Sequence, residues 1–430
     1  MRFSDAVAFL DGLVNYEKQA KPRDRFKLDN IRRLLGLAGN PQERLDSVVL
    51  VAGTKGKGSV CYMLDAALRG CGLRTGLFVS PHVHNVRERI QYGGRPVAPA
   101  VFGRLVERFV PLVRRQPVSY FELTTAMAFA LFARRQPDYS IIEVGLGGRL
   151  DATNLSEPKV SVITRIGLDH VKVLGSTRRQ IAREKAGIMR PGRPVVIGRQ
   201  EQDALAELRR CARACGALLT SAEAATRIGR IRLTRTGTCF SAGTDMGRAD
   251  FRLPLLGRHQ VENCQTALAV LGLLAKDDTR IRLAGVRRGL AKVMVPARCQ
   301  VVSCRPFVMV DSCHNPDSGR ALARVIRDHL NQRVILVYGS LRGKLVKETV
   351  RPLTPWIHSA VLVQPDSPRA LPLAELSRIF TRLRVSHVTA DNVPAAISLV
   401  RNSSLPVVFA GSFYLAGEVL HVLGLNRNQT

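Results

Sequence analysis

The chain has 430 residues, of which 46% are hydrophobic and 23% are charged. These values are close to the globular average and exclude a disordered, collagen-like or coiled-coil chain. A net charge of +31 would attract polyanions, but the basic residues lie in doublets spread along the chain and only 5% of residues are aromatic, which does not favour a nucleic-acid partner.

The nine cysteines form no CxxC pair and no short Cys/His spacing typical of zinc sites. No apolar run approaches the roughly 18 residues of a membrane span, and the N-terminus carries Asp5 and Asp11 within a helix-like pattern. We therefore expect a cytoplasmic protein in a reducing compartment, with neither a signal peptide nor a membrane segment.

In chain order, short β-branched apolar runs alternate with stretches of helical spacing. The runs predict strands at 47–52, 75–79, 140–144 and 160–164, and the helical spacing predicts helices over 59–70, 101–115, 124–135 and 177–189. Such alternation is typical of βαβ units, so we predict an α/β fold with a mainly parallel sheet.

The second half of the chain repeats this alternation after a less regular middle. A helix over 203–215 and short strands at 230–234 and 237–241 are predicted first, then a helix over 260–274 and strands at 307–311, 334–338, 360–363 and 407–410. We place a boundary near Pro296. The prediction is an N-terminal P-loop mononucleotide-binding domain (1–295) and a smaller C-terminal Rossmann-like α/β domain (296–430), with a cleft between them.

A glycine-rich loop follows the first buried strand and leads directly into a helix. Glycines allow backbone N–H groups to face a phosphate, Lys57 supplies a positive charge, and the Ser59 hydroxyl can bind magnesium. This context predicts an ATP or GTP site, although Gly58 makes the spacing differ from the strict Walker form. The alternative is a plain glycine-rich turn.

Other candidate residues have ordinary alternatives when taken alone. Glu143 ends a buried strand and suits a magnesium ion, or it is a solvated carboxylate. His170 alone is as easily structural, and Lys185 on spacing alone is a solvated helix lysine. The turn over 311–315 also suits ordinary turn chemistry, and Ser412 suits a helix N-cap.

Several ordered motifs resemble the folylpolyglutamate synthase/dihydrofolate synthase family of Mur-type ligases. The match is nearly continuous from about 35 to 198 and then occurs in islands. The motifs are VAGTKGKGSV (51–60), SPHV (80–83), RERI (87–90), EVGLGGRLDATN (143–154), REKAGI (183–188), GRHQVEN (257–263), Arg298, DSCHNP (311–316) and GS (411–412).

The resemblance implies an ATP-dependent amide ligase that activates a pteroate or folate carboxylate as an acyl phosphate and joins it to L-glutamate. It implies two magnesium ions, held by Ser59, Ser80, Glu143, His170 and a carbamylated Lys185, and it also suggests a monovalent cation. It assigns catalysis to Lys57, His170 and Lys185, and substrate contacts to Pro81, His82, Arg89, Arg149 and Asp151. The ATP site it implies comprises Gly53, Thr54, Lys55, Gly56, Lys57, Gly58, Ser59, His259, Gln260, Asn263, Arg298, Asp311 and His314.

The chain departs from the family pattern at a few positions. Lys55 stands where bacterial relatives usually carry Asn, Ser312 and Cys313 replace Gly-Ala, and the segment 339–345 keeps Lys344 without its usual flanking aspartates. Two alternatives therefore stay open: a Mur-superfamily ligase acting on another carboxylate or amine, and a basic nucleotide-regulated nucleic-acid binder. Dihydropteroate and folate are not distinguished as substrates. We expect a monomer with small-molecule partners.

Overall fold

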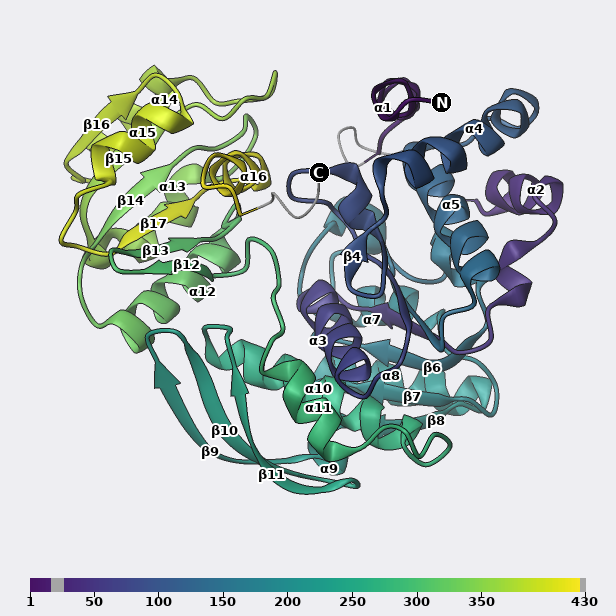
Figure 1. Cartoon of the computed structure of the whole chain (residues 1–430). Coiled ribbons are helices and arrows are strands. Elements are labelled where there is room, and N and C mark those ends of the chain that lie inside the picture. Colours follow the sequence, from purple (N-terminus) through teal and green to yellow (C-terminus); the bar gives the residue numbers. More distant parts are fainter. Residues whose placement is uncertain (17–26, 426–430) are drawn as a thin grey trace.

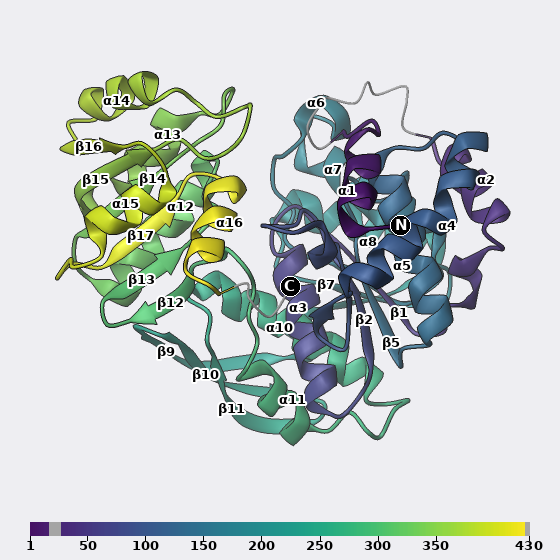
Figure 2. The ribbon, with the colours of Figure 1, turned by 45° about the horizontal axis from the view of Figure 1, so that its top comes forward.

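A computed structural model describes residues 1–16 and 27–425. Figure 1 shows two α/β units side by side, with a three-stranded sheet below both, and Figure 2 shows the same arrangement from a second direction. The larger unit is built on an eight-stranded sheet and the smaller on a six-stranded sheet. The predicted fold class is confirmed.

The eight-stranded sheet is parallel from β2 to β8 and has two antiparallel strands at one edge. Its central strand β1 lies between β5 and β6, so the segments that follow these three strands meet at one edge. The order is β4 (Arg95–Pro96), β3 (Ile90–Tyr92), β2 (Thr75–Phe78), β5 (Tyr139–Glu143), β1 (Val48–Ala52), β6 (Pro158–Ile163), β7 (Pro194–Ile197) and β8 (Leu218–Ser221).

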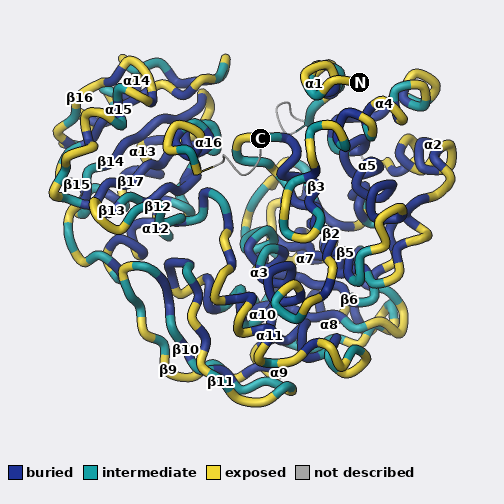
Figure 3. Tube along the Cα trace, in the orientation of Figure 1, coloured by how far each residue is buried: buried dark blue, intermediate teal, exposed yellow. Residues whose placement is uncertain are grey.

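Helices cover both faces of this sheet because its strands are apolar on both sides. In β1, Val48 and Leu50 pack into one core and Val49 and Val51 into the other, as the period of two requires. Figure 3 shows these central strands buried along their length. The first face carries α1 (Phe3–Asp11), α2 (Asp29–Leu37), α4 (Pro99–Arg115), α5 (Tyr120–Arg135), α7 (Arg178–Ala186) and α8 (Gln202–Cys215); the second carries α3 (Lys57–Gly70), α10 (Arg258–Leu274) and α11 (Leu283–Leu290).

The three-stranded sheet is antiparallel and packs its apolar side chains into the second of these cores. Phe240 and Phe251, on neighbouring strands, stack with ring centroids 5.5 Å apart. The strands are β9 (Arg227–Thr234), β10 (Gly237–Thr244) and β11 (Gly247–Leu253), and two short helices, α6 (Val171–Leu174) and α9 (Ala222–Ala225), lie in the preceding connections.

The six-stranded sheet is parallel except for β12 at one edge, and it also has a core on each face. Its order is β12 (Gln300–Cys304), β13 (Phe307–Val310), β17 (Val407–Ala410), β14 (Val334–Tyr338), β15 (Ile357–Val363) and β16 (His387–Ala390). One core contains α12 (Pro316–Val325), α13 (Val346–Val350) and α14 (Leu373–Arg382); the other contains α15 (Val393–Val400) and α16 (Phe413–Val422).

Most strongly apolar elements agree with the predictions within a few residues, but β7 is a buried apolar strand that was not predicted. The helix expected over 124–135 begins earlier, at Tyr120, because Ser119 and Glu122 form a capping box. Strands β3, β4, β7, β8, β11, β12 and β16 were missed. No described helix is long and apolar enough to cross a membrane. The domain boundary near Pro296 stays a prediction. The six-stranded sheet begins at Gln300.

Candidate active site

The glycine-rich loop between β1 and α3 is fixed at its first half. Gly53 has φ 149°, and a Cβ there would lie 1.8 Å from the hydroxyl oxygen of Thr164, so glycine is required. The N–H groups of Thr54 and Lys55 donate to the carbonyl oxygen of Arg165 at 3.0 and 3.1 Å. The first turn of α3 keeps the N–H groups that no intrahelical bond uses, and these can bind an anion.

Glu143 lies beside this loop because β1 and β5 pair in parallel with Val51 opposite Glu143. Its carboxylate is buried; Oε1 is 4.0 Å from Nζ of Lys57, and Oε2 accepts the N–H of Ser80 at 3.0 Å. Burial raises the pKa of Glu143, and Lys57 and the Ser80 N–H offset this in part. A further positive charge nearby would stabilise the ionised form of this carboxylate.

Lys185 on α7 is 3% exposed, and its ammonium group donates to the carbonyl oxygen of Gly147 at 3.4 Å. Burial, reinforced by the charge of Lys57, lowers the pKa of Lys185 to about 7. The side chain of Lys185 is therefore a neutral amine in a large fraction of molecules at neutral pH. Its burial also excludes the alternative of a solvated helix lysine, which its spacing alone allowed.

His170 precedes α6 in a left-handed conformation, with φ 49°. Its side chain is 59% exposed, but the protein around it still removes part of the water from the ring. This desolvation lowers the pKa of His170, Asp169 opposes the change, and the charges of Lys57 and Lys185 add to it. The charges of the three predicted catalytic residues therefore lie close enough to influence one another.

The second glycine-rich turn follows β5 and is organised from within. Asp151 accepts the N–H of Leu146 at 2.9 Å, and the N–H and hydroxyl of Thr153 at 3.0 and 2.5 Å. Arg149 pairs with Glu184 on α7 at 2.9 Å. These contacts favour a loop-organising role for both predicted substrate residues.

The segment after β2 is also held by a carboxylate. Glu88 accepts three N–H groups from residues 83–85, at 2.8 to 3.0 Å. Arg89 is fully buried; it donates to Nδ1 of His82 at 2.8 Å, and its guanidinium lies 5.1 Å from the ring centroid of Tyr120. The sequence did not assign Glu88, although its position three residues after Asn85 fits a capping box.

The second domain supplies the opposite wall. Asp311, at the end of β13, accepts the N–H of Cys299 at 2.7 Å and that of Cys313 at 2.8 Å. Arg298 donates to the hydroxyl of Ser312 at 2.5 Å and lies 4.8 Å from the ring centroid of Phe413. The Ser-Cys departure is therefore accommodated: serine accepts from arginine and Cys313 is buried.

His314 and the residues of α10 complete this wall. Burial, with the charges of Lys344 and Arg298, lowers the pKa of His314 to about 4. Lys344 also lowers the pKa of His170 in the first domain, so it faces both walls. Lys344 was noted from the sequence but given no role. It lies in the loop that follows β14, a strand paired with β17, and ligands bind near loops at the carboxyl ends of such parallel strands. This position could have identified Lys344 as a site residue.

The start of α10 lies against the phosphate loop. A Cβ on Gly56 would come within 2.2 Å of the side-chain oxygen of Asn263, whose amide donates to Gln260 at 3.0 Å. Desolvation lowers the pKa of His259, and the nearby charge of Asp311 opposes the shift. The predicted nucleotide residues thus come from both domains.

The oxygen donors near the loop suit magnesium, which prefers carboxylate, hydroxyl, water and phosphate oxygens. Glu143 is buried with the ammonium group of Lys57 at 4.0 Å, and Ser59 is buried on the first turn of α3. Among the described residues, no three His, Cys, Asp or Glu side chains converge as a metal site. The protein's donors alone would therefore leave room for phosphate and water in the coordination shell.

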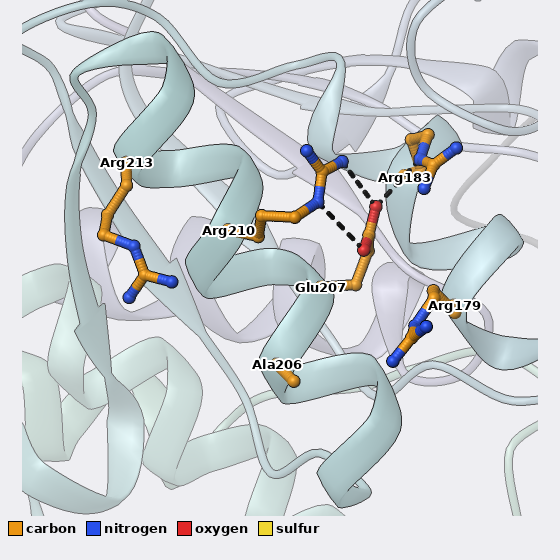
Figure 4. A pocket seen from close by; sticks show the side chains of 6 residues that line it. All are labelled: Arg179, Arg183, Ala206, Glu207, Arg210 and Arg213. Atoms are coloured by element: carbon orange, nitrogen blue, oxygen red, sulfur yellow. Dashed lines mark hydrogen bonds and ion pairs between the residues drawn. The ribbon is translucent and has the colours of Figure 1, made fainter.

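A cavity of about 370 Å³ lies between α7 and α8. Figure 4 shows Glu207 between Arg183 and Arg210, with Arg179 and Arg213 on either side. Glu207 accepts from Arg210 at 2.7 Å and from Arg183 at 2.8 Å; Arg210 foremost lowers the pKa of Glu207 to about 2, against the opposing effect of burial. The cluster is an ion-pair network that joins two helices.

A phosphate-loop domain that faces a second α/β domain fits the class of two-domain, nucleotide-dependent ligases. The family model of the Mur ligase middle domain matches residues 51–271, and that of the Mur ligase, glutamate ligase domain matches residues 297–413. The chain belongs to the folylpolyglutamate synthase/dihydrofolate synthase family of Mur ligases, as its motifs predicted.

Individual relatives agree along nearly the whole chain. The folylpolyglutamate synthase of Lacticaseibacillus casei is 32% identical, over 98% of this chain and 99% of its own. The solved structure of Mycobacterium tuberculosis folylpolyglutamate synthase complexed with ADP and AMPPCP has a TM-score of 0.85 and 32% identity, covering 98% of each chain. A Haloferax volcanii protein named as a bifunctional folylpolyglutamate synthase/dihydropteroate synthase is 35% identical over 97% of this chain, which spans about half (50%) of that relative.

Proposed function

We propose that the protein catalyses the ATP-dependent addition of L-glutamate to the carboxylate of a pteroate or folate. The observation that carries this proposal is the convergence of Lys57, Glu143 and Lys185 in one cleft, faced by Arg298 and His314 of the second domain. The names of the relatives supply the substrate class.

The reaction has two steps, neither of which needs a protein nucleophile. A carboxylate oxygen of the acceptor attacks the γ-phosphorus of ATP, and ADP leaves. The amino nitrogen of glutamate then attacks the acyl carbon, loses a proton and displaces phosphate. Both steps depend on positioning and on neutralising the phosphoryl oxygens.

The first domain holds the phosphates. The open N–H groups of α3 and the ammonium group of Lys57 face the β- and γ-phosphate oxygens and offset their negative charge. Glu143, Ser59 and Ser80 would hold a magnesium ion. When bound, the ion neutralises charge on the phosphate oxygens.

Lys185 is suited to carbamylation, which would complete a second magnesium site with His170. Its neutral amine attacks carbon dioxide; an N–C bond forms and one proton is released, which converts a cationic side chain into an oxygen donor. The lowered pKa and burial of Lys185 support this step.

The second domain would bind the rest of the nucleotide. On the basis of the resemblance to the family, we assign Asn263 to the base, Asp311 to the ribose, and Arg298 and His314 to the phosphates. A monovalent cation, a monomeric state and a cytoplasmic location stay predictions.

The decisive assay measures ADP release by the purified protein with ATP, magnesium and glutamate, offering dihydropteroate and tetrahydrofolate separately. We expect release that requires both glutamate and one of these acceptors, and loss of release in Glu143→Gln. ADP release that depends on a different acid or amine from a substrate panel would instead identify a Mur ligase of another specificity.

A further inference from the structure

Lys55 connects the phosphate loop to the second domain. Its ammonium nitrogen lies 2.5 Å from Oδ2 of Asp317, a residue 262 positions further along the chain. Asp317 is the second residue of α12, the helix that follows β13 and the His314 turn. This ion pair joins the phosphate loop, where ATP is proposed to bind, to the second domain.

The backbone of Lys55 is turned away from the phosphate side of the loop. Its N–H group and that of Thr54 are both bonded to the carbonyl oxygen of Arg165. The N–H groups left for phosphate are those of the α3 N-terminus, and the nearby ammonium is that of Lys57, which lies 4.0 Å from Glu143. Lys55 is therefore available for a different contact.

Asp317 lies in the first turn of α12, where a negative charge stabilises the helix N-terminus, but that local role does not require the contact with Lys55. The N-cap of α12 is Asn315, whose side chain accepts the N–H of Ser318 at 2.9 Å. Arg320 also contacts Asp317, but from the same helix. Burial tends to raise the pKa of Asp317, while Lys55 and then Arg320 outweigh it and lower the pKa, so the carboxylate is charged at neutral pH.

A second contact joins the domains on another side of the cleft. The ring of His84, in the segment after β2, stacks on that of His421 of α16 with centroids 4.6 Å apart. Gly417 of α16 approaches the carbonyl oxygen of Val83 so closely that a Cβ would lie 2.4 Å from it. The two domains thus touch at the phosphate loop and at the segment after β2.

We propose that Lys55 and Asp317 form a latch that holds the second domain closed over the phosphate loop. Both are positioning residues: they bring Arg298, His314 and Lys344 toward the phosphates that Lys57 and α3 hold. The expected effect on kcat rests on the proposed function, whereas the expected effect on domain closure does not. Because both side chains are well exposed (39% and 45%), the pair alone is worth a small factor, about three- to fivefold.

The test is a double-mutant cycle with Lys55→Gln, Asp317→Asn and the double variant, and Arg320→Gln is the matched control. Each single variant should lower kcat about three- to fivefold, and the double variant should be no slower than either single one. Added salt should slow the wild-type enzyme more than these variants. Asp317→Glu should retain activity, and Arg320→Gln should stay within about twofold of wild type.

Small-angle scattering with a non-hydrolysable ATP analogue measures closure without catalysis. The wild type should contract on adding the analogue, and both single variants should contract less. Multiplicative losses in the cycle, or wild-type contraction in Asp317→Asn, would overturn the latch. A loss of analogue affinity in Lys55→Gln alone would assign Lys55 to the phosphates instead. Absence of ligase activity in the wild type would refute the proposed function, while the scattering result would still decide the latch.

Discussion

The two glycine-rich loops of the first domain follow neighbouring parallel strands and use their backbone in opposite ways. The loop after β1 fixes its first half on Arg165 and leaves the N–H groups of α3 open. The turn after β5 directs N–H groups onto Asp151, which accepts three hydrogen bonds. An open helix N-terminus can bind an external anion, whereas an internal carboxylate takes the place of that anion.

The turn after β13 in the second domain resembles the turn after β5, because an internal carboxylate accepts its backbone N–H groups. Asp311 accepts the N–H groups of Cys299 and Cys313, and this leaves His314 at the cleft. Glycine content alone therefore does not identify a phosphate site; the acceptors already present in the loop decide.

The sharpest test of the open loop is Lys57→Ala. Removing the positive charge that faces the phosphates should lower kcat by about 1000-fold or more, because charge neutralisation dominates phosphoryl transfer. The variant should stay folded, with the free energy of unfolding in urea lowered by about 1–3 kcal/mol because Glu143 loses the charge that offsets its burial. Lys292→Ala, an exposed lysine just after α11, is the matched control and should keep wild-type turnover. Near-normal turnover in Lys57→Ala would remove the proposed role.

A pair of glycine variants separates the fixed half of the loop from the open half. Gly53→Ala should cost about 2–4 kcal/mol in the free energy of unfolding, because its φ is positive and Thr164 occupies the space of a methyl group. In Gly58→Ala the new Cβ would meet Glu143 at an ordinary 3.5 Å, so stability should change by less than about 1 kcal/mol. Turnover should still fall about tenfold because the methyl group lies beside the proposed magnesium ligand. Urea unfolding and ADP release measure both, and equal stability losses would contradict the distinction.

Asp151→Asn tests whether the second turn is organised from within. An amide N–H₂ would face a backbone donor, so unfolding should become easier by about 1–3 kcal/mol. At a temperature where the variant is folded, kcat should fall less than tenfold. A much larger loss of kcat with unchanged thermal stability would mean that Asp151 binds substrate.

The smallest expected effect concerns the pH dependence of stability and involves His314, in the turn after β13. Its folded-state pKa of about 4 lies below the ordinary value of 6.5, so the unfolded chain binds the extra proton between these pH values. The free energy of unfolding should therefore rise as pH increases from 4 to 6.5. His314→Gln should flatten this rise by about 1–3 kcal/mol, measured by urea unfolding at several pH values. An unchanged slope would show that the ring is not desolvated.

Local sequence was enough for most central elements, though not for β7, and for the position of the main loop. Continuous apolar runs such as that of β1 predict strands buried on both faces, and the glycine-rich segment between β1 and α3 predicts an anion site. The edge strands β4, β8, β12 and β16 and the neighbouring β3 were missed because they are short or only partly apolar, so packing, not pattern, defines them.

The sequence by itself determined the family, the alternation of strands and helices, and which residue types could act on phosphate and magnesium. Only the tertiary structure decided that Asp151 organises its own turn, that Lys185 is buried with a pKa near 7, and that Lys55 meets Asp317 across the cleft. The reason is physical: local patterns set the elements, whereas burial and pairing over hundreds of positions depend on how two sheets and their helices pack.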